Sequence, residues 1–148
     1  MVWKPNVTVA AVIEQDGRFL LVEERTARGI RFNQPAGHLE RHESLLQGVV
    51  RETLEETAYV FAPEWLLGIY RWHHRGTRTT YLRFAFSGRV TGFDAGRKLD
   101  EGIIRAHWLG PEEIRNRSPR HRSPLVMRCI DDYLAGKRYP LELITHYE

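Results

Sequence analysis

Hydrophobic and polar residues are distributed along this chain with periods that predict several β-strands and one long helix. Residues 7–13 (VTVAAVI) form a continuous β-branched and apolar run, which is typical of a buried strand. The dipeptide Asp16-Gly17 favours a hairpin turn, and residues 18–23 are predicted to be the returning strand. Further strands are predicted at residues 58–61, 66–74, 79–86 and 103–109.

The segment 79–86 has the clearest alternation in the chain. Leu82, Phe84 and Phe86 share one face of the predicted strand, and Arg83 lies on the opposite face. The remaining stretches predict a polar loop at residues 24–31, a short edge strand with a tight bend at 32–39, a turn at 63–64 and a loop at 88–96.

A helix is predicted from residue 45 to about Thr57, with no proline to interrupt it. Ser44 and Gln47 have the form of a capping box, in which each side chain accepts a hydrogen bond near the start of the helix. Leucine, valine and threonine side chains fill one half of the helical wheel. Two more helices are predicted, one that opens at Pro111 and one over residues 123–134. The pattern as a whole predicts an α/β (α+β) fold with a mixed β-sheet sandwiched between α-helices.

Three glutamates of the predicted helix, Glu52, Glu55 and Glu56, are spaced at i, i+3 and i+4 and therefore share one arc of its surface. Carboxylates crowded in this way repel one another, and helix propensity alone does not select them. A divalent cation relieves the repulsion, and hard oxygen ligands suit Mg²⁺ or Mn²⁺. The alternative is a solvated helix face on which Arg51 pairs with the glutamates.

Composition limits the remaining possibilities. A chain of 148 residues with 42% hydrophobic and 11% aromatic residues is expected to fold as one globular domain over residues 1–148. The single cysteine, Cys129, excludes an internal disulfide and a cysteine-based zinc site. No membrane span or signal pattern is present, so we expect a cytoplasmic protein. A net charge of +3 suits a phosphate-bearing substrate but is too small to indicate nucleic acid.

The spacing of Gly37, Glu43 and residues 51–57 (RETLEET) resembles the signature of the Nudix hydrolases. Thr53 stands where that signature has a bulky aliphatic residue, and Ala58 replaces its last glycine, which we interpret as local packing adjustments. Flanking segments are similar to a bacterial branch of the family, the NudJ phosphatases, at residues 33–40, 122–126 and 136–142.

The resemblance implies a Nudix fold and metal-dependent hydrolysis of a diphosphate linkage. Glu52 and Glu56 are the first expected ligands of Mg²⁺, with Mn²⁺ as an alternative ion. Glu55 and the backbone carbonyl of Ala36 complete the expected metal site, and Glu52 and Glu55 are also expected to be catalytic.

The resemblance also assigns structural roles within the motif, to Gly37, Glu43 and Arg51. Glu43 and Arg51 are expected to pair and to orient the site. In this family a base or a further metal ligand often comes from a later loop. Glu101 is the preferred candidate for this catalytic role, with its neighbour Asp100 as the alternative.

Substrate contacts are expected from Arg25, His38 and Arg83, and Arg28 and Arg31 of the loop before Pro35 could also contact phosphate, less specifically. An exposed strand arginine is the alternative interpretation of Arg83, and a surface or core role is favoured for the other histidines. The aromatic residues Trp3, Phe32, Trp72 and Tyr81 could stack a base, although most of them are expected to belong to the core.

The function that we expect is Mg²⁺-dependent cleavage of small nucleoside di- and triphosphates or of the diphosphate of the thiamine pyrimidine precursor. The alternatives are removal of diphosphate from RNA 5′ ends and a Nudix-fold binding module without catalysis. The expected partners are small-molecule substrates, with no nucleic acid and no membrane. We expect a monomer, although the sequence does not determine the oligomeric state.

Overall fold

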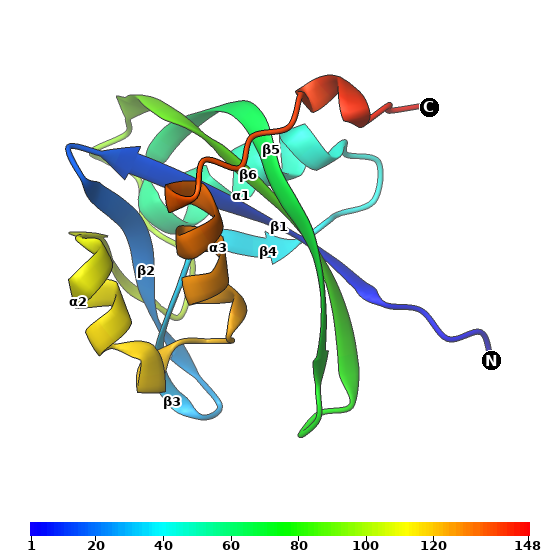
Figure 1. Cartoon of the computed structure of the whole chain (residues 1–148), viewed down its shortest axis with the longest axis horizontal. Helices are drawn as coiled ribbons and strands as arrows, with labels where there is room; N and C mark the ends of the chain where they lie inside the picture. The colour runs from blue at the N-terminus through cyan, green and yellow to red at the C-terminus, as the bar shows by residue number, and fades with distance from the viewer.

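The apolar run at residues 7–13 forms the middle of strand β1 (Asn6–Gln15), which lies inside a seven-stranded sheet in the computed structural model (Figure 1). The structure describes residues 1–148. The other strands are β2 (Arg18–Thr26), β3 (Gly29–Asn33), β4 (Ala36–His38), β5 (Tyr59–His74), β6 (Thr79–Phe93) and β7 (Ile103–Leu109). The helices are α1 (Leu45–Thr57), α2 (Pro111–Asn116) and α3 (Leu125–Leu134), with 3₁₀ turns at Ser118–Arg120 and Leu141–Leu143.

The sheet contains both parallel and antiparallel pairs. Strand β1 pairs in parallel with β6 and antiparallel with β4, and it meets β2 at the hairpin turn. Strand β6 continues antiparallel to β5, while β2 lies between β3 and β7. The predicted mixed sheet is therefore confirmed. Asp16 and Gly17 both have positive φ angles, of 53° and 79°, as a tight hairpin turn requires.

Helices cover both faces of the sheet, which explains why the run in β1 is apolar at every position. Val9, Ala11 and Ile13 point into a buried cluster that includes Val49 of α1. The intervening residues Ala10 and Val12 point into a second cluster with side chains of α2 and α3. In Figure 1, α1 lies behind the sheet, and α2 and α3 lie in front of it. The expected sandwich of a mixed sheet between helices is confirmed.

Helix α1 begins and ends as the sequence predicts. The Ser44 hydroxyl accepts a hydrogen bond from the Gln47 amide at 3.0 Å, and the Gln47 side chain accepts one from the Ser44 amide at 2.8 Å. Thr53 is fully buried, and its hydroxyl donates to the Val49 carbonyl, so the polar group is satisfied. Ala58 has a φ of 65° in the left-handed region, so its position constrains the backbone as well as the packing.

The prediction of a polar loop at residues 24–31 is wrong. Residues 24–26 belong to β2, residues 29–31 belong to β3, and only Ala27 and Arg28 form the turn between them. The charged side chains in this hairpin lie on a sheet edge near solvent, where polarity does not distinguish a strand from a loop.

The predicted turn at residues 63–64 and most of the predicted loop at 88–96 are also wrong. Strand β5 continues through Pro63, where the pairing shifts by a bulge before Trp65. Strand β6 continues to Phe93. A β-carbon at Gly88 would lie 2.1 Å from the Ala62 carbonyl oxygen, so this glycine permits close approach of two strands. The two strands form a long hairpin that extends below the sheet in Figure 1.

None of the helices is both long enough and apolar enough to cross a membrane.

Candidate active site

Strand β4 lies directly against the glutamates of α1. A β-carbon at Gly37 would lie 2.2 Å from the carboxyl carbon of Glu52, so the Glu52 carboxylate occupies the space beside this glycine. The amide of the preceding residue, Ala36, donates to Oε1 of Glu56 at 3.0 Å. The short strand therefore positions two of the three predicted acidic side chains.

Arg51 connects the acidic side chains that surround it. Its Nε and Nη2 atoms donate to Glu43 at 2.9 and 2.8 Å, which is the pair expected from the sequence. Its Nη1 atom also donates to Glu52 at 2.7 Å and to Glu55 at 2.6 Å. The hydrogen bond from Arg51 holds the pKa of the Glu43 carboxyl below its ordinary value. Arg51 therefore fixes the positions of three carboxylates at once.

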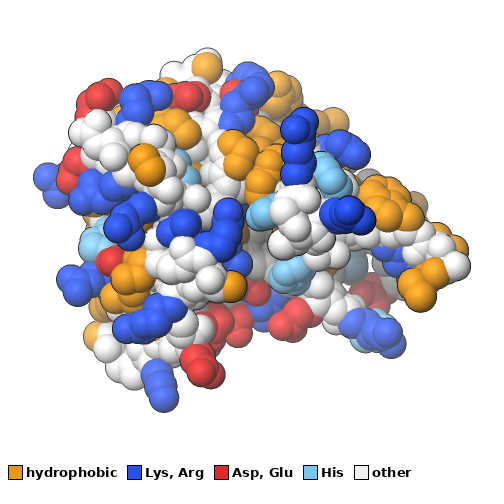
Figure 2. All heavy atoms as spheres, turned by 90° about the horizontal axis from the view of Figure 1, so that it is seen from below, with side chains coloured by type: hydrophobic (Ala, Val, Ile, Leu, Met, Phe, Trp, Pro, Cys, Tyr) orange, Lys and Arg blue, Asp and Glu red, His pale blue; other side chains and the backbone are white.

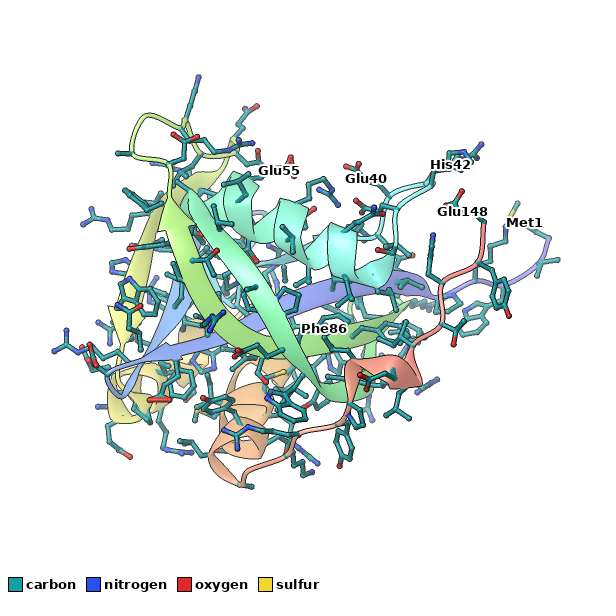
Figure 3. All side chains as sticks on the ribbon, turned by 90° about the horizontal axis from the view of Figure 1, so that it is seen from above. Met1, Glu40, His42, Glu55, Phe86 and Glu148 are labelled. Carbon is teal, nitrogen blue, oxygen red and sulfur yellow. The ribbon has the colours of Figure 1, made fainter.

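Asp100 joins the carboxylates of α1. One oxygen atom from each of Glu52, Glu55 and Asp100 lies within 4.8 Å of the other two. The backbone amide of Asp100 donates to the Glu55 carbonyl at 3.0 Å, which ties the loop before β7 to the helix. Glu101, the preferred candidate from the sequence, is exposed and lies outside this cluster. In Figure 3, the labelled Glu55 of α1 and Glu40 of the loop before it lie on the same side of the helix.

The pKa values of three acidic groups in the site, Glu56, Glu52 and Asp100, are raised. Burial raises the pKa of Glu56 to about 9, repulsion from Glu52 adds to the effect, and the Ala36 amide opposes it. Burial also raises the pKa of Glu52 and of Asp100, and Glu55 repels both of them. Clustered carboxylate oxygens whose charges repel one another suit a hard divalent cation, so these residues fit the metal that the sequence analysis expected.

A cleft of about 720 Å³ opens beside the carboxylates. Its floor is a face of the sheet, where Thr8 of β1, Arg83 of β6 and His38 of β4 lie in one cross-strand row. Its walls are the β2–β3 turn, the tip of the β5–β6 hairpin and the segment before α3. In Figure 2, Lys and Arg side chains gather to the left of the central hollow, and acidic side chains lie along its lower edge.

The cleft contains three arginines, one of which the sequence did not suggest as a phosphate contact. Arg83 lines the cleft but is only 6% exposed, so its interpretation as an exposed strand arginine is wrong. Arg25 is exposed and does not line the cleft, because Glu24 and Thr26 of the same strand face it and alternate residues point the opposite way. The other two arginines are Arg28, which the sequence suggested as a phosphate contact, and Arg122, which it did not.

Aromatic side chains form the wall on the hairpin side. Trp72 and Tyr81 are cross-strand partners, and their rings stack with centroids 5.7 Å apart and an interplanar angle of 19°. His74 and His38 lie nearby and also line the cleft. Phe32 belongs to the core instead.

Asn33 and Gln34 are functional candidates that the sequence pattern does not reveal. Their side-chain oxygens accept hydrogen bonds from Arg83, each at 3.0 Å. They are separated from Arg83 by 50 and 49 positions, and no local spacing reveals a contact of that length. Their position in the segment just before Gly37 was the only available signal.

A carboxylate-bearing helix held against a glycine in a sheet edge, beside an arginine-lined cleft, is suited to hold a cation next to a phosphate-bearing compound. A model of the NUDIX domain matches residues 3–129, and the chain belongs to the Nudix family. The expectation drawn from the signature is thereby confirmed.

Relatives with known names refine this assignment. Phosphatase NudJ from Escherichia coli (strain K12) is 39% identical over 145 residues, which cover 98% of this chain and 94% of that protein. A solved NUDIX hydrolase from Nitrosomonas europaea is 59% identical, with a TM-score of 0.95 over 97% of this chain and 98% of the other. A MutT NUDIX hydrolase from Burkholderia pseudomallei, at 18% identity and a TM-score of 0.75, covers 88% of this chain and 98% of that one and shares the fold. The chain is a Nudix hydrolase similar to the NudJ phosphatases.

Proposed function

We propose that residues 1–148 act as one Nudix hydrolase domain that cleaves the diphosphate linkage of small nucleoside di- and triphosphates, or of the thiamine pyrimidine diphosphate. The observation that supports this substrate class is the composition of a single cleft. Glu52 and Glu56 lie in the same cavity as Arg83 and the stacked rings of Trp72 and Tyr81. Such a cavity offers ligands for a cation, a charge for phosphate and a surface for a planar ring.

The carboxylates of Glu52, Glu55 and Glu56, with the Ala36 carbonyl and Asp100, would hold Mg²⁺ or Mn²⁺. When bound, the cation would neutralise charge on the phosphoryl oxygens and lower the pKa of a water molecule. Arg51 holds the carboxylates of Glu52 and Glu55 next to each other through hydrogen bonds of 2.7 and 2.6 Å.

Asp100 is proposed for the role that the sequence analysis gave to Glu101, which is to accept the proton of the attacking water or to complete the metal site. Its support is the cluster that Asp100 forms with Glu52 and Glu55. A general base must lie within hydrogen-bonding reach of the proton that it removes, and the loop before β7 brings Asp100 to the carboxylates.

Arg28, Arg83 and Arg122 would donate hydrogen bonds to the phosphate oxygens, because guanidinium groups grip such oxygens at two points. His38 on the floor of the cleft would contact the substrate. Trp72 would stack against the base or the pyrimidine ring. Since stacking accepts any planar ring, specificity among bases should be loose.

The test is steady-state kinetics with Mg²⁺ on a matched panel of nucleoside diphosphates, nucleoside triphosphates and a pyrimidine diphosphate. We expect Mg²⁺-dependent turnover of these small substrates, and Glu56→Gln should lose orders of magnitude in kcat while its circular dichroism spectrum is unchanged. Near-normal turnover of Glu56→Gln at saturating Mg²⁺ would remove Glu56 from the metal site.

The same panel separates the alternative functions. A kcat/KM far higher for 5′-triphosphorylated RNA or a diadenosine polyphosphate than for every small substrate would overturn the proposed substrate class. RNA is disfavoured because the net charge of +3 is small for a protein that follows a phosphate backbone. A binding module without catalysis would show no turnover of any member. The proposal retains a cytoplasmic monomer as the expected form of the protein.

A further inference from the structure

Arg83 carries a buried positive charge that no carboxylate neutralises. Its Nη1 atom donates to the Gln34 side-chain oxygen at 3.0 Å and contacts the Cys129 sulfur at 3.8 Å. Its Nη2 atom donates to the Asn33 side-chain oxygen at 3.0 Å. The side chain is only 6% exposed, and a buried charge is normally paired with an opposite one. Burying this unpaired charge costs free energy of folding, which a bound anion would offset.

Two carboxylates near this region are paired with other cations. Glu24 accepts from Arg122 at 2.6 Å across the cleft wall. Asp132 accepts a hydrogen bond from the Tyr70 hydroxyl at 2.7 Å and is paired with Arg128 and Lys137 at 3.1 and 3.2 Å. Burial raises the pKa of the Cys129 thiol, which keeps the sulfur uncharged near neutral pH. None of these groups cancels the charge of Arg83.

Two amide side chains hold the guanidinium where carboxylates of nearly the same size would fit. Gln34 is fully buried, and its Nε2 atom donates to the Val126 carbonyl at 2.8 Å, which turns its oxygen toward Arg83. Asn33 is 9% exposed and lines the cleft. An amide oxygen orients the guanidinium without removing its charge, whereas an aspartate or glutamate would form an ion pair with it.

The guanidinium retains donors for a ligand. A guanidinium has five N–H groups, and the contacts to Gln34, Asn33 and Cys129 use three of them, which leaves two. Two N–H groups suffice for a bidentate grip on phosphate oxygens. Because Arg83 lines the cleft that also holds Glu52 and Glu56, such a ligand would lie in the same cavity as the carboxylates.

We propose that Asn33 and Gln34 are positioning residues that keep Arg83 as an anion receptor, so that the cleft binds a phosphate or diphosphate group at Arg83 without a divalent cation. The inference rests on the proposed function for its physiological meaning and assigns the site that holds a phosphate of the substrate. It also adds a property that metal-bound phosphate alone would not produce, which is anion binding in the presence of a chelator.

The experiment titrates inorganic diphosphate into the full-length chain by calorimetry with EDTA present. The key variant is Asn33→Asp. The Asn33 side-chain oxygen accepts a hydrogen bond from Arg83, and an aspartate oxygen can still accept that bond while adding a negative charge. We expect the wild-type protein to bind and Asn33→Asp to bind at least about tenfold more weakly, because the new carboxylate neutralises the receptor. The melting temperature of Asn33→Asp should equal or exceed that of the wild type, because the new carboxylate can pair with Arg83.

The control for added negative charge is Thr77→Asp, which places one carboxylate in the same cleft at the hairpin tip. It should weaken diphosphate binding much less than Asn33→Asp does. In steady-state kinetics Asn33→Asp should raise KM more than it lowers kcat. A purely structural amide would leave KM unchanged when the protein is folded.

Two results would overturn the proposal. One is equal metal-free diphosphate affinity in wild-type and Asn33→Asp proteins, and the other is a wild-type protein that binds no diphosphate without metal. If Asn33→Asp does not fold, Arg83→Gln replaces it, and a folded Arg83→Gln protein with wild-type affinity would also refute the receptor. The failure of the proposed function is separate, since it would appear as metal-free binding without turnover of any substrate in the panel.

Discussion

The Glu52 carboxylate fills the space that a β-carbon of residue 37 would occupy, and at this position the need for glycine is one of space. Ala58 shows the other reason for which glycine is used, because its φ of 65° lies in the left-handed region where an L-residue costs roughly 1–2 kcal/mol. At the scale of single residues, the site therefore depends on where each carboxylate lies. Substitutions of Gly37 and of Asp100 test this dependence.

Gly37→Ala should impair catalysis more than stability. The added methyl group would push the Glu52 carboxylate aside, and because that carboxylate ends a flexible side chain, the fold can adjust. A misplacement of about 1 Å can lower the rate ~100-fold, so we expect a loss of that order in kcat/KM with little change in melting temperature. The control is Gly92→Ala, where a β-carbon would meet Val60 at an ordinary 3.5 Å. Wild-type kcat/KM in Gly37→Ala would show that Glu52 need not be held in place.

The neighbours Asp100 and Glu101 provide matched controls for each other. Asp100→Asn should lower kcat by about 10²–10⁴-fold if it supplies the base, whereas Glu101→Gln should stay close to the wild-type rate. The reason is that Asp100 is part of the cluster with Glu52 and Glu55 and Glu101 is not. Rates measured at saturating substrate and Mg²⁺ decide between them. A severe loss in Glu101→Gln with a normal Asp100→Asn would restore the assignment made from the sequence.

At the scale of elements, helix α1 positions acidic side chains where a helix does not favour them. Glu52, Glu55 and Glu56 lie in its second half, close to the negative end of the helix dipole, and its last turn contains no basic residue. The helix therefore depends on the capping box at Ser44 and on the buried side facing the sheet. Strand β4 and the loop before β7 then approach its acidic arc from outside.

Ser44→Ala should destabilise the protein while leaving the chemistry largely intact. Loss of the hydroxyl removes the 3.0 Å hydrogen bond to the Gln47 amide, and loss of an N-cap typically costs about 1 kcal/mol. For a chain of this size we expect a fall of roughly 2–4 °C in melting temperature, measured by calorimetry. Ser44→Thr, which can still cap, should retain most of the stability. Equal melting temperatures for Ser44→Ala and the wild type would mean that tertiary packing alone fixes the start of α1.

At the scale of the whole molecule, the cleft forms where three parts of the chain that are distant in sequence meet. The β2–β3 turn, the β5–β6 hairpin and the segment before α3 surround a sheet face, and α1 supplies carboxylates from the opposite side of that sheet. Figure 1 shows the two hairpins projecting below the sheet. Because the acidic groups become buried only when these parts assemble, folding, protonation and cation binding are coupled.

The metal-free protein should lose stability as the pH rises. Burial raises the pKa of Glu56 from 4.5 to about 9, so between these values the folded chain holds a proton that the unfolded chain has released. Glu56 alone then lowers the free energy of unfolding by at most about 1.4 kcal/mol per pH unit as the pH rises, and the raised pKa values of Glu52 and Asp100 act in the same direction. The pKa of Glu43 is lowered instead, chiefly by the hydrogen bond from Arg51. The stability that Glu43 contributes is therefore fully present above the ordinary carboxyl pKa of 4.5, and it does not reverse the fall in stability at higher pH.

Melting temperatures measured at about pH 6 and about pH 9, with EDTA and with saturating Mg²⁺, test this coupling. We expect the melting temperature to fall between the two pH values in EDTA, and Mg²⁺ to stabilise more at the higher pH, because the ion competes with protons for the carboxylates. Glu56→Gln should flatten the pH dependence in EDTA. A melting temperature that rises with pH in the chelated wild-type protein would contradict the assigned pKa shift.

Local sequence patterns determined much of this protein. The capping box and uninterrupted run predicted α1 within a residue, and the i, i+3, i+4 spacing placed its glutamates on one arc. The continuous apolar run predicted β1, and the last predicted strand coincides with β7. These features follow from hydrogen bonds and periodicities that span only a few residues, so neighbouring positions contain the information.

Tertiary structure alone decided the features that depend on distant partners. Asp100 rather than Glu101 joins the carboxylates because its amide bonds to Glu55, and Arg83 is buried because Asn33 and Gln34 lie across the sheet from it. Pro63 and Gly88 signal a turn and a loop by composition, yet strand pairing keeps both in β5 and β6. Side-chain direction and strand continuity in these places are set by contacts between residues far apart in the chain, whose energies outweigh local propensity.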